Sequence, residues 1–169
     1  MNKLTFTAKD YSETSELAGL IRKIDAIDAE YANRVSDEIF KHQPFFLTVL
    51  LGYRVDVSAQ ELEELMKIYF LIWEYFKPNK NLRKKKVTQT QFEKVQRRNM
   101  YMLNYSEGES EESRDKIYTD ELQNLKSKSL WAAVQFRYNT RTVLVNMDPE
   151  NKGIILIGIL SFIQCFETQ

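Results

Sequence analysis

The sequence predicts an all-α protein. Only five glycines and three prolines occur among 169 residues, a composition typical of long helices joined by few turns. Apolar residues recur at three- and four-residue steps along most of the chain, which is the helical period. The last stretch is apolar on nearly every side and must therefore be surrounded by other elements. We expect a single helical domain, residues 1–169, with five or six helices in a compact bundle around a buried C-terminal helix.

The N-terminal part changes period near residue 12. Residues 3–8 alternate polar and apolar side chains and are interpreted as a short strand or an ordered arm. Residues 12–41 then predict one long amphipathic helix that stops before Pro44, because a proline moves the preceding residue out of the helical region. Its apolar spacing would also suit the seam of a homodimer. The apolar positions are Leu17, Leu20, Ile21, Ile24, Ile27, Tyr31, Val35 and Ile39.

Two further helices are predicted before the middle of the chain. Pro44 can open a short helix through residue 51, with Gly52 as its C-terminal cap. Ser58 and Glu61 have the spacing of a capping box, which predicts a helix that runs to residue 76. This helix becomes apolar on most faces near its end, so we expect it to enter the core.

Two charged connectors follow, at about residues 77–89 and 106–118. Between residues 77 and 98 only Glu93 is acidic, whereas nine residues are basic. Thr90 and Glu93 suggest a second capping box and a helix over residues 90–105. Between residues 107 and 121 the balance is seven acids to two bases. Because residues 106–113 carry no apolar side chain, we expect a mobile loop there, with helix resuming near Thr119.

The end of the chain is predicted to be helical. Residues 140–147 suit a strand paired with residues 3–8 or a continued helix, and helix is favoured because an isolated strand pair adds little stability. Asp148 and Pro149 then form a typical helix start. The apolar run that follows is about 14 residues long, which is shorter than a membrane span and favours a core helix over an anchor. Its two glycines, Gly153 and Gly158, would permit close packing.

The sequence offers little catalytic chemistry. One histidine and one cysteine cannot form a metal-binding cluster, and no phosphate-binding loop occurs, so no cofactor and no metal are predicted. Cys165 is expected to be a buried apolar residue in a reducing, cytoplasmic setting. His42 is interpreted as a helix-end residue that meets carbonyl groups. Glu74 lies among aromatic residues, where a surface position is favoured over a buried one with a raised pKa.

The basic stretch is the feature that folding alone does not explain. It could contact phosphates or an acidic partner, and Tyr101 and Tyr105 could stack on bases. Two observations oppose this reading. The chain has 24 basic and 24 acidic residues and therefore no net charge, and the acidic stretch close by in sequence could neutralise the patch. The candidate contact residues are Arg83, Lys84, Lys85, Lys86, Arg97 and Arg98.

Three functions are compatible with these observations. The preferred one is a non-enzymatic helical protein-binding or regulatory module, such as an adaptor, an inhibitor or an immunity-type protein, with a protein partner and no membrane. It is preferred because a well-formed core occurs without a catalytic constellation. The second is a nucleic-acid-associated accessory protein that uses the basic stretch. The third is a ligand-binding or enzymatic bundle with a pocket near Glu74 and His42.

Overall fold

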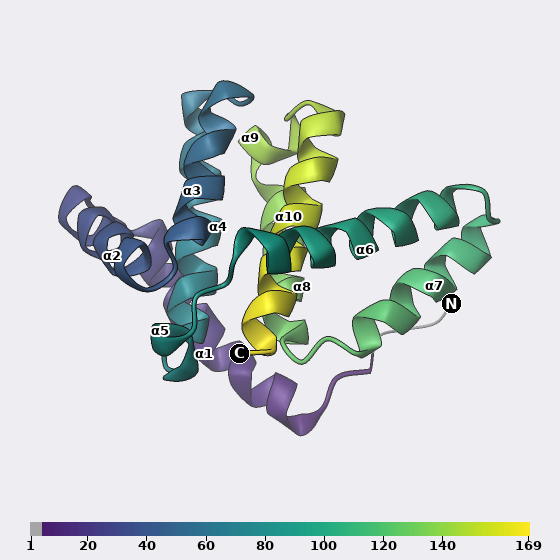
Figure 1. Cartoon of the computed structure of the whole chain (residues 1–169), viewed down its shortest axis with the longest axis horizontal. Helices are drawn as coiled ribbons and strands as arrows, with labels where there is room; N and C mark the ends of the chain where they lie inside the picture. Colours follow the sequence, from purple (N-terminus) through teal and green to yellow (C-terminus); the bar gives the residue numbers. More distant parts are fainter. Residues whose placement is uncertain (1–4) are drawn as a thin grey trace.

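The structure, a computed structural model, describes residues 5–169, and this part of the chain is all-α, as predicted (Figure 1). It contains more helices than the expected five or six because one predicted helix is divided and because short helices occupy two connectors. The elements are α1 (Ala8–Asp25), α2 (Ala29–His42), α3 (Pro44–Gly52), the 3₁₀ turn η1 (Tyr53–Val55), α4 (Ala59–Phe76), α5 (Asn81–Lys84), α6 (Gln89–Glu107), α7 (Glu111–Gln123), α8 (Lys128–Thr140), α9 (Thr142–Val145) and α10 (Pro149–Glu167).

The core lies between α4 and α10. Every residue from Ile68 to Trp73 is buried, and the C-terminal half of α10 is buried on most sides. The rings of Phe46 and Tyr69 stack with centroids 4.4 Å apart, and Phe162 of α10 meets Phe46 edge-on at 4.8 Å. The prediction of a buried C-terminal helix is therefore confirmed for its second half, whereas Ile154 in its first half is 47 % exposed.

The long helix predicted for residues 12–41 is wrong, because the structure divides it into α1 and α2. The break falls at Ala26, Ile27 and Asp28. The Asp28 carboxylate accepts a hydrogen bond from the Tyr31 backbone N–H at 2.8 Å and so caps a new helix. Aspartate competes with the helical backbone for hydrogen bonds in this way. As a result α1 packs against α4 and α8, whereas α2 packs against α3.

Some of the predicted caps are confirmed and others are wrong. Ser58 forms the predicted capping box with Glu61 at the start of α4. At the start of α6 the cap is Thr88 rather than Thr90, and the Thr88 hydroxyl accepts from the Gln91 N–H at 3.2 Å. Gly52 has the ordinary helical φ of −61° and leads into η1, so it does not form the left-handed cap that was expected.

The acidic segment forms helices instead of the expected mobile loop. Helix α6 continues to Glu107, and α7 begins at Glu111, eight residues before the predicted position. The Ser110 hydroxyl accepts from the Ser113 N–H, and Glu111 and Glu112 occupy the first turn. Acids at this position are favoured by the positive end of the helix dipole. Local capping therefore offsets the absence of apolar side chains in residues 106–113.

Helix rather than strand is confirmed within residues 140–147, where Thr142–Val145 forms the single turn α9, and residues 5–169 contain no strand. The expected continuation of the preceding helix is wrong, because α8 ends at Thr140 and Arg141 has an extended backbone. Of the predicted arm at residues 3–8, the first two residues lie outside the described part of the chain. Residues 5–7 lack regular structure, and Ala8 begins α1. No helix in the described part is long and apolar enough to cross a membrane.

Helices α6 and α7 form a hairpin that leaves the rest of the bundle. Figure 1 shows α6 crossing α10 and continuing beyond it, after which α7 returns toward α8. The remaining long helices (α1–α4, α8 and α10) form the body of the protein. The α6–α7 hairpin and the body are therefore distinct in position, and they also differ in the chemistry of their surfaces.

Candidate functional site

Helix α6 is fixed to α10 by an aromatic stack and a half-buried amide. The rings of Phe92 and Phe162 stack with centroids 4.2 Å apart. About two turns further on, the Asn99 amide nitrogen donates to Ser161 Oγ at 2.9 Å and to Gln164 Oε1 at 2.8 Å. Both amide hydrogens are thus used in contacts with α10. These contacts set the position of the hairpin relative to the body.

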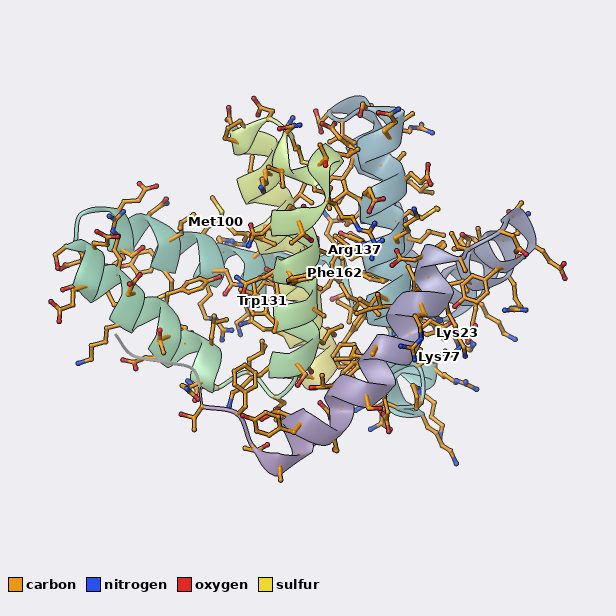
Figure 2. All side chains as sticks on the ribbon, turned by 180° about the vertical axis from the view of Figure 1, so that it is seen from behind. Lys23, Lys77, Met100, Trp131, Arg137 and Phe162 are labelled. Atoms are coloured by element: carbon orange, nitrogen blue, oxygen red, sulfur yellow. The ribbon has the colours of Figure 1, made fainter. Side chains whose placement is uncertain are left out.

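A cavity of about 190 Å³ lies where the α6–α7 hairpin meets α8 and α10. Trp131 of α8 forms part of its wall, and Figure 2 shows Trp131 near the centre of the molecule. The few polar side chains that line it include Asn99 and Gln164, which bond to each other, and the exposed Glu121. Apolar side chains from all four helices make up most of the wall, among them Met102, Leu103, Ile117, Leu122, Leu156 and Leu160.

The size and the wall of this cavity restrict what it can hold. An apolar cavity of about 150 Å³ accommodates a benzene ring, whereas sites for drug-sized ligands and cofactors measure roughly 300–1,000 Å³. The cavity therefore matches one large apolar side chain or a very small apolar molecule. Its wall lacks a nucleophile–base pair. Leu103 and Tyr118, which line it, are 42 % and 46 % exposed, so apolar surface continues from the cavity to the outside.

An acidic segment, residues 107–121, borders the cavity. All of its acids are exposed, and none forms an ion pair with another residue in the described part of the chain. Glu121 belongs both to this segment and to the cavity wall. The hairpin thus presents an apolar depression beside negative charge. The acids are Glu107, Glu109, Glu111, Glu112, Asp115, Asp120 and Glu121.

The predicted basic contact residues are also exposed. They fall into two groups: a basic segment, residues 83–86, around the end of α5, and an adjacent pair on α6. None forms an ion pair with a described residue, so the direct neutralisation by nearby acids that was considered from the sequence is absent there. The exposed residues are Arg83, Lys84, Lys85, Lys86, Arg97 and Arg98.

The basic segment is held in place by Gln43, a residue that sequence reasoning did not identify. The buried Gln43 side chain donates from Nε2 to the carbonyl oxygens of Leu82 at 2.6 Å and Lys85 at 2.8 Å. Its Oε1 accepts from the Val87 backbone N–H at 2.9 Å. One amide therefore satisfies three backbone groups of the connector. Its position just before Pro44 gave no sign of this long-range role.

Glu74 and His42 lie in the body and do not share a described cavity. The expected surface position of Glu74 is wrong, since its side chain is only 8 % exposed. The carboxylate is paired with Lys77 at 2.8 Å and accepts from the Tyr31 hydroxyl at 3.1 Å. Burial and this carboxylate raise the pKa of Tyr31 to about 12. His42 stacks on Trp73 and places Nδ1 3.4 Å from the Arg83 carbonyl oxygen.

An ion network around the buried Arg137, also missed from the sequence, joins α1, α4 and α8. Arg137 is 5 % exposed and pairs with Asp25 at 2.6 Å and with Glu64 at 3.3 Å, while the more exposed Arg141 pairs with Asp25 at 2.9 Å. Burial acts to raise the pKa of Asp25, but Arg137, Arg141 and Lys67 outweigh it and lower this pKa below its ordinary value. The network connects three helices of the body and does not line the hairpin cavity.

Cys165 is buried, as predicted, and burial raises the pKa of its thiol to about 11. A thiol with a raised pKa is a poor nucleophile near neutral pH. In residues 5–169 no group of three or more histidine, cysteine or acidic side chains is arranged to hold a metal ion.

Comparison of this all-α chain with protein-family models, with curated proteins and with solved structures finds no match. The functional inference below is therefore drawn from the chain's own surfaces.

Proposed function

We propose that this chain is a non-enzymatic helical protein-binding module whose partner docks on the α6–α7 hairpin. The observation that supports this most is the apolar cavity at the base of the hairpin, which is open to an exposed apolar surface. Apolar surface of this kind on a folded protein marks an interaction site more often than an isolated exposed side chain does. Binding without turnover is what an adaptor, an inhibitor or an immunity-type protein does.

The cavity suits a single anchor residue. Protein interfaces gain most of their binding energy from a few large side chains that fill desolvated pockets on the partner. A volume of about 190 Å³ is enough for one leucine, phenylalanine or tryptophan side chain. The exposed rims formed by Leu103 and Tyr118 would then cover the neighbouring apolar positions of the same partner segment.

The negative charge beside the cavity supports a partner that carries basic residues. The acidic segment has seven exposed carboxylates without ion pairs in the described part of the chain. Complementary charge at the rim of an interface favours encounter and orientation. The partner segment is therefore an amphipathic helix with an apolar face and flanking lysines or arginines, which is a common way of filling a groove between helices.

A pair of designed peptides tests this function by calorimetry. Both are amphipathic helices of leucine with one phenylalanine anchor; one carries lysines on its polar face and the other glutamates. The proposal expects saturable one-to-one binding of the lysine peptide and binding of the glutamate peptide that is at least about tenfold weaker. Absence of saturable binding by either peptide, or equal affinity for both, would contradict it.

Glycine positions provide matched variants for the same titration. Gly153 lines the cavity, and a Cβ at this position meets no atom within 4 Å, so Gly153→Phe places a ring at the cavity without a backbone clash. Gly52 also has open space around a built Cβ but lies at the end of α3 and does not line the cavity. Gly153→Phe should weaken binding of the lysine peptide, and Gly52→Phe should leave it unchanged.

A further inference from the structure

Helix α6 carries a second surface, which the proposed function does not use. Five exposed residues share the side of α6 that faces away from the cavity, and we call them the α6 outer face: Lys94, Arg97, Arg98, Tyr101 and Tyr105. At about 100° of rotation per residue, all five lie within about 60° of one direction around the helix axis. The inward side of the same helix carries Phe92 and Asn99, which contact α10.

The cations and the tyrosines of the α6 outer face occupy different parts of the helix. The three cations come first, and the two tyrosines follow at the next turns, 69 % and 57 % exposed. Lys94 to Tyr105 covers about 16 Å of helix axis. No acidic residue falls on this side of α6, since Glu93 and Glu107 lie toward other directions. The basic segment 83–86, held by Gln43, precedes the N-terminal end of the same helix.

This combination matches the chemistry of a single strand of nucleic acid. Cations that lack ion pairs within the described part of the chain are available to phosphates, and exposed tyrosine rings can stack on unpaired bases. Exposed aromatic rings also occur at Tyr11, Phe40 and Phe136. What distinguishes Tyr101 and Tyr105 is that they share a helix side with three cations. We propose that the α6 outer face and the basic segment bind single-stranded nucleic acid, with phosphates on the cations and bases on Tyr101 and Tyr105.

The zero net charge of the chain does not oppose this inference. Glu93 is the nearest acid in sequence, but it accepts a hydrogen bond from Gln89 and forms no ion pair with a described cation. The acidic segment follows α6, and α7 packs on the cavity side of that helix, opposite the outer face. Attraction of a strand depends on the local charge within about a Debye length, roughly 8–10 Å at ordinary salt. The two charged surfaces of the hairpin therefore suit two different partners.

The test is fluorescence anisotropy of labelled oligonucleotides of about 15 bases, titrated with the full chain at about 50 and 200 mM salt. Thymidine and uridine oligomers distinguish DNA from RNA, and a duplex of the same length tests strand preference. With about four phosphate contacts, the affinity for a single strand should fall about 50-fold between the two salt concentrations. No binding at the lower salt, or equal affinity for duplex and single strand, would overturn the proposal.

Two double variants separate charge from stacking. Arg97→Ala with Arg98→Ala should reduce the logarithmic salt slope by about 1.4, because two phosphate contacts are lost. Tyr101→Ala with Tyr105→Ala should lower the affinity at least about fivefold and leave the salt slope unchanged. If the tyrosine variants bind like wild type, the stacking part of the proposal is wrong.

The matched control is a second pair of adjacent, exposed cations. Arg22 and Lys23 on α1 form no ion pair with a described residue, and Figure 2 shows Lys23 and the α6 residue Met100 on opposite sides of the molecule. Arg22→Ala with Lys23→Ala changes the net charge as much as the α6 pair does. It should leave the salt slope unchanged, and an equal loss would show that binding depends on total charge and not on the α6 outer face.

Discussion

The body of the protein and its α6–α7 hairpin differ in where their polar and charged side chains lie and in whether these side chains have partners. In the body, buried polar groups such as Arg137, Glu74 and Gln43 have partners at 2.6–3.3 Å. On the hairpin, Arg97, Arg98 and the acids of residues 107–121 are exposed without ion pairs among described residues, and they lie near an apolar cavity. We interpret this difference as a division of tasks, in which the body provides stability and the hairpin binds partners.

Arg137 offers one of the two strongest ways to disturb the body. Arg137→Leu would remove the buried member of the network, while Asp25 would keep Arg141 and Glu64 would keep Lys67. Removal of one member of a fully buried ion pair costs about 3–5 kcal/mol, and because these two acids keep another partner we expect the free energy of unfolding in urea to fall by about 2–3 kcal/mol. The matched variant is Arg141→Leu, whose side chain is 44 % exposed and which should cost less than about 1 kcal/mol. Equal effects of the two variants would contradict the assigned role of Arg137.

Gln43 should have a comparable effect. Gln43→Met keeps the length of the side chain but leaves two carbonyl oxygens and one N–H of the connector without this partner. Unsatisfied buried groups cost about 1–3 kcal/mol each, so a loss of roughly 3 kcal/mol in unfolding free energy is expected. Gln89→Met, at an exposed glutamine on α6, serves as the control and should change stability by less than about 0.5 kcal/mol.

The pH dependence of stability should report the same network. The pKa of Asp25 is lower in the folded protein than its ordinary value, so its ionised form contributes stability above the unfolded pKa of about 3.9. This contribution is lost as the pH falls through the folded pKa. Asp25→Asn should therefore be less stable than wild type at neutral pH, and the difference should shrink in acid. Urea titrations at several pH values measure this, and a constant difference would contradict the argument.

The smallest effect is expected in the hairpin cavity. Gly153 lies inside α10 with open space around a built Cβ, and glycine is a poor helix former. Gly153→Phe should leave the unfolding free energy unchanged or raise it by up to about 0.5 kcal/mol. Gly158 provides the contrast, because a Cβ there would lie 2.9 Å from the Tyr53 hydroxyl oxygen. Gly158→Ala should destabilise, and thermal unfolding of both variants tests the difference.

Short sequence patterns correctly predicted helices whose start is set by residues next to each other in the chain. The capping box at Ser58, the proline starts of α3 and α10 and the long apolar runs identified three helices that form the core. The signals that failed were also local, and two of the failures changed where helices begin and end. Asp28 interrupts a continuous apolar period with its own cap, and Ser110 starts a helix in a segment without apolar side chains.

The contacts of Gln43 and Arg137 and the hairpin cavity could not be predicted, because each depends on residues that are far apart in the sequence. Gln43 reaches residues about 40 positions away, and Arg137 meets Asp25 across 112 positions. The cavity requires four helices to meet. By contrast, the exposure of the basic stretch could be expected from its composition, because so many like charges cannot be buried. The position of Arg97 and Arg98 on the same side of α6 as Tyr101 and Tyr105 follows only once this segment is known to be a continuous helix.

The most direct test of the division between body and hairpin is a quantitative pull-down. Wild type, Gly153→Phe and Gly52→Phe would be recovered from extracts of cells that express the protein naturally, and bound proteins would be measured by mass spectrometry. We predict a stoichiometric protein partner that wild type and Gly52→Phe retain equally and that Gly153→Phe loses at least about tenfold. Equal retention by all three variants would show that the partner does not dock at the hairpin cavity.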